Sequence, residues 1–528
     1  MGIFFMLPVA GIVAAGLLPA GRLDLAAVLE TLGRPFVMQV AWFTLWQAVV
    51  STLLTVAAAL PGAYLLARFE FPGKRVLGAL SIVPFVLPTV VVAAAFLALL
   101  GPRGALAPLG IRLDQTIWAI LLAHVFYNYA IVLRIVGSVW AQLDPRLEDA
   151  ARALGATRWA AFRHVTLPLL RPAILSAASI VFLFTFTSFG VILLLGGPHY
   201  ATLEVEIYRQ TAHLLELRVA ATLALLQMVA LTLLLLVYAR LQERLAVGLR
   251  LMPARITARQ PRGAREKAFV AANLLFVAVL LGLPLAVLVE RSLAGSAGYG
   301  VANYAALFDA GGRGGLFVPP LEAMRNSLVF AFFATALAVI LGLLAGAVIG
   351  YRRGAIAQGF DALLMLPLGT SAVIVGFGML LTLGGMAAGL RTSVLLIPIA
   401  HALIALPFIV RSVAPVMRAI DGRLREAARV LGAPPAAAWR EVDLPIVSRA
   451  ALVGAGFAFA VSLGEFGATI FIARPEAPTM PIAVFRLLSQ PGTLAFGQAM
   501  AMATLLMIVT GVAVVLVDRF RAGSIGQF

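Results

Sequence analysis

The chain has 528 residues, of which 62% are apolar and only 12% are charged, and its mean hydropathy is +1.02. A soluble domain is nearer half apolar and a quarter charged, so this much apolar surface cannot be hidden in one soluble core. The composition therefore predicts a protein that crosses the membrane many times. Cysteine is absent, which excludes a disulfide framework, thiolate metal sites and cysteine nucleophiles.

Twelve apolar stretches near the length of a membrane-spanning helix follow one another along the chain. The first six lie near 3–20, 41–66, 77–100, 116–136, 173–195 and 218–239, and the second six lie near 268–289, 327–350, 361–383, 392–412, 449–472 and 497–517. No basic segment precedes the first stretch and no clear cleavage site follows it, so we expect a retained span rather than a signal peptide.

An arginine-rich polar run separates the two sets of spans. It divides the chain into a first unit, 1–240, a cytoplasmic basic linker, 241–267, and a second unit, 268–528. With the linker and both termini in the cytoplasm, most of the 40 Lys and Arg residues fall on the cytoplasmic side, as is usual in membrane proteins. This distribution accounts for the net charge of +17 without a nucleic-acid partner.

The two units repeat each other in sequence. His124 and His401 stand in similar surroundings, Leu-Ala-His and Ile-Ala-His, at an offset of 277 residues. The same offset matches Arg134 with Arg411, Asp144 with Asp421, Leu167-Pro168 with Leu444-Pro445, Phe189-Gly190 with Phe466-Gly467, and Arg209 with Arg486. An even number of spans in each unit gives the units a parallel orientation. The predicted fold class is an all-α polytopic membrane protein with about twelve transmembrane helices in two parallel six-helix repeats.

The loop between the fourth and fifth spans of each unit is long and not simply polar. We define the first loop as residues 143–172 and the second loop as residues 420–449. Asp144 and Asp421 are suited to cap a short helix that is rich in alanine and leucine. Each loop is therefore expected to begin with a capped helix rather than with irregular chain.

A glycine follows this short helix in each loop. Gly155 and Gly432 suit the left-handed turn that ends a helix. A second short amphipathic helix comes next, and we expect Pro168 and Pro445 to stop it before the following span. Each loop is thus predicted to form a helix–glycine–helix bracket.

Both loops share one long motif: an acidic residue, two alanines, three residues, a glycine, nine residues, an aliphatic residue, one residue and Leu-Pro. The motif residues are Asp149, Ala150, Ala151, Gly155, Val165, Leu167 and Pro168 in the first loop, and Glu426, Ala427, Ala428, Gly432, Val442, Leu444 and Pro445 in the second. This pattern resembles the coupling loop of binding-protein-dependent ABC importer permeases of the type I fold. The resemblance covers nearly the whole chain, as a fused pair of six-span permease units.

The resemblance implies partners for this chain. In that family the short helix of the loop sits in a groove on a cytoplasmic ATPase subunit, so we expect two ABC ATPase subunits and an extracytoplasmic solute-binding protein. The implied ATPase-coupling residues are Asp149, Ala150, Ala151, Gly155, Trp159 and Phe162 in the first loop, and Glu426, Ala427, Ala428, Gly432 and Trp439 in the second. Pro434-Pro435 stands where the first loop has Thr157-Arg158, so we expect the two ATPase contacts to differ.

The chain itself lacks a motif for ATP binding. A phosphate-binding loop needs a glycine-rich backbone and a lysine followed directly by Ser or Thr. The only lysines, Lys74 and Lys267, are followed by Arg and Ala. We therefore predict a subunit that is not an enzyme, has no catalytic, cofactor or metal site of its own, and relies on ATP bound by its partners.

Polar groups within spans are costly and usually functional. His124 and His401 occupy equivalent spans, where they either bind substrate or form hydrogen bonds to neighbouring helices. Glu465, whose repeat partner is Ser188, either attracts a cationic substrate or forms a buried hydrogen bond between helices. These four residues are the candidates for a substrate path.

Within the family, the chain is most similar to the fused permeases for thiamine, with those for ferric iron second. The stretches that carry this similarity are Leu45-Trp46-Gln47-Ala48, 121–128, Leu195-Gly196-Gly197 and 202–208. The resemblance implies an importer in the bacterial cytoplasmic (inner) membrane that moves thiamine or a thiamine phosphate, with ferric iron as the alternative. An ion-coupled secondary transporter is the alternative from another class, but it needs more titratable groups near the midplane than this chain has.

Overall fold

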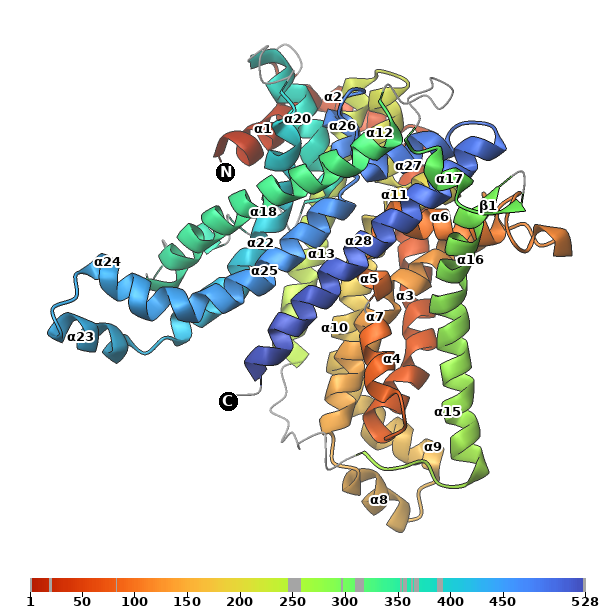
Figure 1. Cartoon of the computed structure of the whole chain (residues 1–528), viewed down its shortest axis with the longest axis vertical. Coiled ribbons are helices and arrows are strands. Elements are labelled where there is room, and N and C mark those ends of the chain that lie inside the picture. The colour runs from red at the N-terminus through yellow and green to blue at the C-terminus, as the bar shows by residue number, and fades with distance from the viewer. Residues whose placement is uncertain are drawn as a thin grey trace.

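The computed structural model of the chain is almost entirely helical (Figure 1). It describes residues 2–18, 21–81, 83–245, 258–295, 298–308, 318–351, 354, 359–361, 364, 370–386 and 393–525. The strands among these residues are one antiparallel pair, β1 (Ala294–Gly295) and β2 (Gly298–Tyr299). The predicted all-α class is confirmed.

Nine helices in the described part of the chain are long and apolar enough to cross a membrane. Six are α3 (Pro35–Arg68), α7 (Ile117–Gln142), α13 (Leu217–Leu245), α18 (Pro320–Tyr351), α22 (Leu396–Ala419) and α28 (Thr493–Ile525), and three are the continuous stretches Arg158–Phe186, Gly263–Leu293 and Pro435–Gly464. Long helices are expected here because hydrocarbon offers the backbone no other hydrogen-bond partner.

The remaining predicted spans coincide with shorter or bent apolar helices. Val76–Val86 and α6 (Thr89–Leu100) form a pair bent by 102°. Two short apolar helices, Phe4–Leu17 and Ala372–Leu383, match the first and ninth predicted spans, and the latter is part of α20 (Ala372–Met386). The described helices therefore follow the predicted order of spans along the chain.

Helices recur at the offset of 277 residues. In the first unit these are α8 (Arg146–Ala153), α9 (Arg158–Ala161), the π turn η4 (Phe162–Thr166), α10 (Leu167–Phe186) and α12 (Leu203–Ala212). Their counterparts are α23 (Gly422–Val430), α24 (Pro435–Ala438), the π turn η6 (Trp439–Asp443), α25 (Leu444–Gly464) and α27 (Met480–Leu488). The repeat in sequence is thus a repeat in structure.

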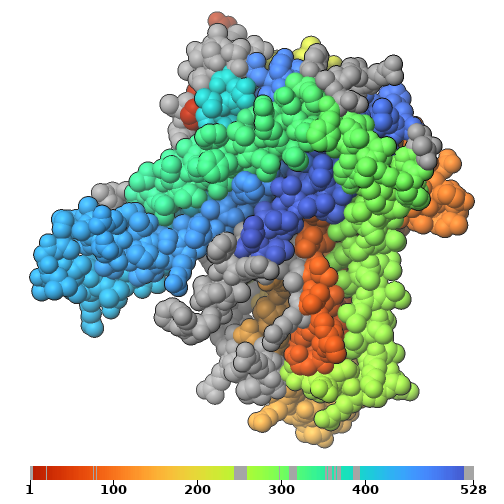
Figure 2. All heavy atoms as spheres, viewed as in Figure 1, coloured from red at the N-terminus to blue at the C-terminus, as the bar shows by residue number. Residues whose placement is uncertain are grey.

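The long helices form two arms that diverge from a common head (Figures 1 and 2). One arm contains α3, α7, α10 and α15 (Gly263–Val277) and ends at α8 and α9, whereas the other contains α18, α22 and α25 and ends at α23 and α24. The head contains α12, α20, α27 and the short helices α11 (Gly190–Leu195) and α26 (Thr469–Ile472). The first and second loops therefore lie apart from each other and far from the head.

The first span of each unit packs against the other unit. α1 (Leu7–Leu17) contacts α20 of the second unit as well as α13 of its own. α16 (Leu283–Leu293) contacts α6 of the first unit as well as α28 of its own. This exchange joins the units through buried helix contacts in addition to the linker.

The prediction that Pro168 and Pro445 stop the preceding helix is wrong. Arg158–Phe186 and Pro435–Gly464 are each one continuous helix that starts in the loop. A five-residue π turn lies just before each proline, and in η4 the Leu167 N–H donates to the Phe162 carbonyl. In a π turn each N–H bonds the carbonyl five residues earlier instead of four. This change in hydrogen-bond spacing comes just before the proline, which has no N–H to donate, and the helix continues through it.

The end of the predicted linker is attached to the first unit. Arg259 pairs with the chain after α3, since its N–H donates to the Arg68 carbonyl at 3.0 Å and its carbonyl accepts from Glu70 N–H at 2.9 Å. Its guanidinium donates to Glu266 at 2.5 and 2.8 Å and lies over the Phe69 ring. The middle of the predicted linker, 246–257, lies outside the described residues.

Glycines determine how closely α18 and α22 approach each other in the arm that contains them. A Cβ added at Gly342 of α18 would lie 2.3 Å from Cγ2 of Ile409 on α22, and one at Gly346 would lie 2.8 Å from Cγ1 of Val413. The two helices therefore approach so closely that a side chain does not fit between them, as is common where helices meet in membranes.

We expect Gly342→Ala to destabilise the protein by about 1–3 kcal/mol, because the added methyl group overpacks the contact between α18 and α22. Thermal unfolding of the detergent-solubilised protein measures this effect. Gly511→Ala in α28 is the matched control, because a Cβ at that position meets nothing within 4 Å. Equal loss of stability in both variants would contradict the packing argument.

Candidate functional site

Each loop is organised around the glycine that ends its first short helix. Gly155 (φ +92°) and Gly432 (φ +83°) adopt the left-handed conformation, as the sequence predicts. Ala156 N–H donates to the Ala151 carbonyl at 3.1 Å, and the second loop repeats this bond at 3.0 Å. This is the six-to-one hydrogen bond of a Schellman motif, so the second alanine of the sequence motif supplies the carbonyl that closes the turn.

The predicted aspartate caps are also present. Asp144 Oδ1 accepts a hydrogen bond from Arg146 N–H at 2.9 Å, and Asp421 Oδ1 accepts one from Arg423 N–H at 3.0 Å. These bonds satisfy backbone donors that the first turn of a helix leaves open. Both ends of each short helix are therefore fixed by local hydrogen bonds.

A pair of side chains ties each short helix to the base of the next span. The Thr166 hydroxyl donates to Glu148 in the first loop, whereas Arg425 Nε donates to Asp443 Oδ1 at 2.8 Å in the second. The two pairs occupy equivalent positions in the repeat. The carboxylate belongs to the short helix in the first loop and to the base of the next span in the second. Sequence reasoning missed them, although complementary residues at the same spacing of 18 in both loops were a usable signal.

The tips of both loops expose large apolar side chains. Leu154 is 90% exposed and its repeat partner Leu431 is 87% exposed. Trp159 in α9 is 67% exposed and Val430 at the end of α23 is 86% exposed. Exposed apolar residues gathered at a rigid tip mark a surface for contact with another protein.

The two tips differ in their aromatic residues. Trp159 stacks on Phe162 at 5.6 Å between ring centroids, and Phe162 stacks on Trp140 at 6.0 Å. Phe162 thus joins α9 to the end of α7 instead of facing outward. In the second loop Trp439 takes the place of Phe162, and the place of Trp159 is taken by Ala436.

Pro434-Pro435 does not displace the second short helix of its loop. α9 and α24 have equivalent bounds, and Pro435 occupies the first position of α24, where its missing N–H removes no hydrogen bond. In α9 the Thr157 hydroxyl caps this turn by accepting from Ala160 N–H at 3.2 Å. The two tips therefore differ in the presence of Trp159 and in the Thr157 cap, which Pro434 cannot make.

The motif carboxylates lie on the exposed side of the short helices. Asp149 is exposed, and Arg152 lies 3.8 Å from it in a weak surface pair. Glu426 is exposed at the equivalent position, beside exposed Ala427. Ala150 is exposed as well, whereas Ala151 and Ala428 are half-buried. These residues leave a small, acidic surface next to each apolar tip.

The two predicted path histidines are buried and bonded within their own units. His124 Nδ1 lies 2.9 Å from the Ser51 hydroxyl of α3, and its Nε2 lies 2.8 Å from the Ser188 hydroxyl. His401 Nδ1 lies 2.7 Å from the Ser462 hydroxyl, and its Nε2 lies 2.8 Å from the Thr469 hydroxyl. Of the two interpretations, this geometry favours hydrogen bonds between helices.

Glu465 caps a short helix next to His401. Its Oε1 accepts from Ala468 N–H at 2.7 Å, and its Oε2 accepts from Thr469 N–H at 3.0 Å and lies 3.3 Å from His401 Nε2. The side chain is buried, and its oxygens are occupied by α26 and the histidine. Glu465 and its repeat partner Ser188 thus both bond the histidine of their unit.

Aromatic side chains that are equivalent in the repeat meet where the units touch. The rings of Phe189 and Phe466 stack at 5.4 Å between centroids. Tyr208 of α12 and Phe485 of α27 are a second equivalent pair, 6.5 Å apart, and they pack against Phe189 and Phe466 in turn. We call these four residues the axial aromatic cluster, because contacts between equivalent residues lie on the axis that relates the units.

The cluster forms at breaks in the long helices. α10 ends at Phe186 and α25 ends at Gly464, so Phe189 and Phe466 stand in the short turns before α11 and α26. A Cβ on Gly190, the residue after Phe189, would lie 2.5 Å from Thr89 Oγ1 at the start of α6. The absence of a side chain there lets α6 support the turn that carries the aromatic ring.

Sequence reasoning also missed a buried carboxylate on α12. Glu204 is buried and accepts a hydrogen bond from Gln227 Nε2 of α13 at 2.7 Å. Its repeat position holds Pro481, so the second unit lacks a counterpart. Among the described residues, no group of three or more His, Cys, Asp or Glu side chains is placed to hold a metal ion.

Comparison with known proteins supports the same family. Residues 56–250 match the family described as binding-protein-dependent transport system inner membrane component. The chain is 29% identical to the thiamine transport system permease protein ThiP of Brucella abortus (strain 2308), over 95% of this chain and 90% of that protein. It is also 29% identical to ThiP of Escherichia coli (strain K12), over 85% of this chain and 83% of that protein.

A further relative matches a smaller part of the chain. The sulfate transport system permease protein CysT of Escherichia coli (strain K12) is 31% identical over 37% of this chain and 70% of that protein. The chain therefore belongs to the family of binding-protein-dependent transport system inner membrane components, the permeases of ABC importers.

Proposed function

We propose that this chain supplies both permease units of an ATP-driven importer for thiamine or a thiamine phosphate. The observation that carries the proposal is the pair of rigid loops with exposed apolar tips at the ends of the two arms. The substrate class is supported by similarity to thiamine permeases over 95% of the chain. A solute-binding protein would select the solute and deliver it at the head.

Each loop is suited to receive force from a separate ATPase subunit. The glycine turn fixes the angle between the two short helices, and the side-chain pair Glu148–Thr166 or Arg425–Asp443 fixes the first helix to the next span. The exposed tip residues, with Leu154 and Leu431 at the turn, would fill a groove on the ATPase. The loop then moves as one body with its span.

The span transmits this movement to the axis between the units. Arg158–Phe186 runs without a break from the docking helix of the first loop to the residues just before Phe189, and Pro435–Gly464 does the same before Phe466. When the ATPase subunits close, the loops approach each other, and the long helices carry that displacement to the aromatic rings. Separation of the rings then opens the path from the head.

The arrangement of the arms supports a resting state that is open toward the ATPase side. The loops are far apart, whereas the axial aromatic cluster is in contact (Figure 1). With the loops in the cytoplasm, the cluster closes the outer end of the path. The linker and the C-terminus are then cytoplasmic, whereas the N-terminus lies beside the head (Figure 1). One copy of the chain serves two ATPase subunits.

Gly432→Val is expected to abolish ATP hydrolysis stimulated by the binding protein. A Cβ at Gly432 meets nothing within 4 Å, so the variant avoids a clash but strains the left-handed backbone by about 1–2 kcal/mol and turns the docking helix away. Gly155→Val should act in the same way. Hydrolysis by the reconstituted complex, with and without loaded binding protein, measures the effect.

The matched control is Gly422→Val. Gly422 lies in the same loop, has equally open surroundings and does not have a positive φ. It should retain stimulated hydrolysis. Normal stimulation in Gly432→Val and Gly155→Val would show that these loops do not transmit the force.

Phe466→Ala is expected to let solute leak through the permease without ATP. Removal of this buried ring takes away about 3–5 kcal/mol of packing from the closed side of the path. Efflux of radiolabelled thiamine from preloaded proteoliposomes measures the leak. Phe332→Ala, which removes a ring that is 64% exposed on α18, is the control, and equal efflux from both variants would contradict a closing role for the cluster.

The substrate proposal is tested with the purified complex. We expect one copy of this chain for every two ATPase subunits, and ATP-dependent uptake of thiamine when the cognate binding protein is present. Native mass measurement gives the stoichiometry, and uptake of radiolabelled thiamine against radiolabelled iron(III) gives the substrate. Uptake of iron alone, or two copies of the chain per complex, would overturn this part of the proposal.

A further inference from the structure

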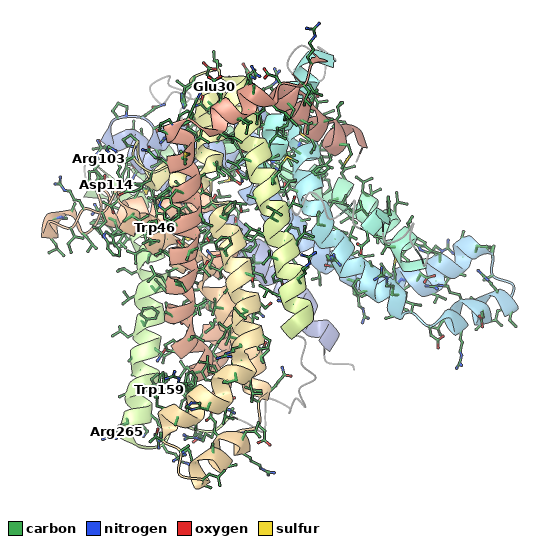
Figure 3. The ribbon with its side chains drawn as sticks, turned by 180° about the vertical axis from the view of Figure 1, so that it is seen from behind. Glu30, Trp46, Arg103, Asp114, Trp159 and Arg265 are labelled. Atoms are coloured by element: carbon green, nitrogen blue, oxygen red, sulfur yellow. The ribbon has the colours of Figure 1, made fainter. Side chains whose placement is uncertain are left out.

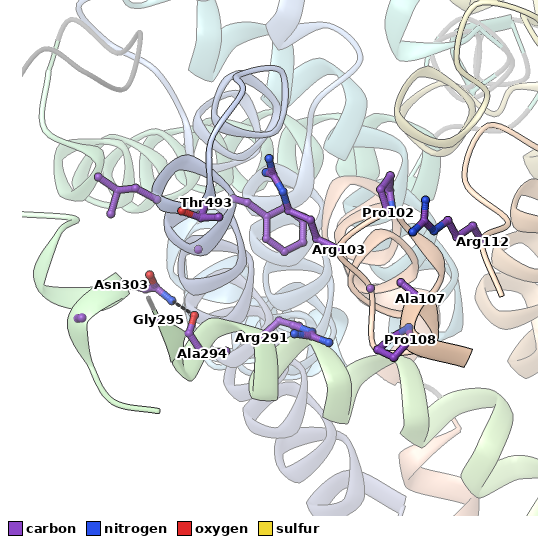
Figure 4. Close-up of a pocket in the computed structure, with 15 residues that line it drawn as sticks. Pro102, Arg103, Ala107, Pro108, Arg112, Arg291, Ala294, Gly295, Asn303 and Thr493 are labelled. Carbon is purple, nitrogen blue, oxygen red and sulfur yellow. Dashed lines mark hydrogen bonds between the residues drawn. The ribbon is translucent and has the colours of Figure 1, made fainter. Parts of the chain in front are cut away.

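A cavity of about 590 Å³ lies at the side of the head, where α6, α16 and α17 (Ala302–Ala305) come together (Figures 1 and 4). Its walls come from both units: the segment after α6 in the first, and α16, β1, α17 and the start of α28 in the second. Gly104, Gly295 and Gly497 are among the residues that line it.

Three arginines surround this cavity, two on the segment after α6 and one on α16. They are Arg103, Arg112 and Arg291, and Figure 4 shows their side chains on different walls. Arg103 donates to the Gly492 carbonyl at 2.7 Å, and Arg291 Nε lies 3.3 Å from Glu290. Arg112 is exposed and has no ion pair with a carboxylate among the described residues.

The carboxylates near the cavity do not neutralise it. None of the lining residues is acidic. Glu290 is paired with Arg291 and accepts a hydrogen bond from the Tyr299 hydroxyl at 2.6 Å, and Asp114 lies two residues beyond Arg112 on the same segment. The cavity therefore keeps an excess of positive charge.

The first unit has an ion pair at the corresponding corner. There Asp24 caps α2 (Leu25–Leu32), and Arg218 of α13 donates to it at 2.6 Å. The hydrogen bond from Arg218 also lowers the pKa of Asp24. At the offset of 277 residues the second unit has Val301 and Ala495, so this ion pair is missing where the arginine-lined cavity lies.

A belt of exposed tryptophans lies at the head ends of α3 and α7. Trp42, Trp46 and Trp118 are 66%, 39% and 59% exposed and come from the ends of α3 and α7 nearest the head. Figure 3 shows Trp46 on the same side of the molecule as Arg103, closer to the end that carries Trp159. Exposed tryptophans mark the boundary between hydrocarbon and lipid headgroups, so the arginines lie at headgroup depth.

The segment that carries two of the arginines also projects sideways from the head (Figure 2). Leu109 and Ile111 on this segment are 72% and 43% exposed, and Leu494 on the opposite wall is 53% exposed. An apolar projection beside a cationic cavity offers surface for acyl chains next to groups that bind phosphate.

We propose that this cavity binds the phosphate of an anionic phospholipid from the surrounding bilayer. Arginine guanidinium groups match the geometry of phosphate oxygens and bind them in pairs of hydrogen bonds. The excess positive charge favours a lipid with net negative charge over a zwitterionic one. Because the cavity joins the segment after α6 to α16 and α28, the bound lipid would fasten the two units together at the head.

Lipid binding itself does not depend on the function proposed above, but the assignment of the lipid to one leaflet rests on that function. With the loops in the cytoplasm, the lipid belongs to the outer leaflet. An acidic side chain of the binding protein is the other ligand that three arginines could take. The sideways projection and the tryptophan belt favour the lipid, because they place the cavity at the perimeter of the bundle rather than on its axis.

Native mass spectrometry of the full chain, titrated with phosphatidylglycerol or phosphatidylcholine in detergent, tests the proposal. We expect the unmodified chain to retain one phosphatidylglycerol more tightly than phosphatidylcholine. Arg103→Gln combined with Arg112→Gln should weaken this binding about tenfold or more, a loss of at least about 1.4 kcal/mol, because both charged donors to the phosphate are removed. Arg22→Gln, at an exposed arginine outside the cavity, is the control and should bind as the unmodified chain does.

Three outcomes would overturn the proposal. One is equal retention of phosphatidylglycerol by all variants. Another is displacement of the lipid by millimolar inorganic phosphate, which would indicate a site for free phosphate. The third is unchanged lipid retention with weaker stimulation of hydrolysis by the binding protein, which would assign the arginines to that protein. Lipid retention is measured without ATP, so its failure leaves the importer proposal intact.

Discussion

The structure depends on one constraint: a backbone polar group within hydrocarbon must find its partner inside the protein. Long uninterrupted helices satisfy it along both arms. Where the helices break, at Thr187 and Glu465, the open groups lie inside the head and are bonded by side chains and by adjoining turns. The constraint therefore confines irregular backbone to the contact between the units, which is where the axial aromatic cluster stands.

The same constraint explains why single helices run from the loops to the head. Since the spans of α10 and α25 cannot break within the bilayer, each runs from a loop tip to an axial ring as one rod. The π turns η4 and η6 let these rods pass through a proline without losing continuity. In the proposed function, no chain of small side-chain movements is needed between the loop tip and the aromatic rings, because one continuous helix spans the distance.

The two units are similar but not identical. The loop tips differ by Trp159 against Ala436, and the corners of the head differ by an ion pair against an arginine-lined cavity. Inside the spans both units keep a buried histidine whose two ring nitrogens are bonded to hydroxyl groups. The hydroxyl partners are not equivalent in the repeat, since they are Ser51 and Ser188 in the first unit and Ser462 and Thr469 in the second.

The sequence by itself determined the membrane class, the order of spans, the repeat register and the left-handed turns at Gly155 and Gly432. These features follow from composition, periodicity and local backbone preference, which act over a few residues. Only the tertiary structure decided that His124 and His401 bond their neighbours, that Glu465 caps α26, and that Phe189 meets Phe466. Each of these depends on a partner from another helix, and local sequence does not specify which side chains distant spans bring within reach.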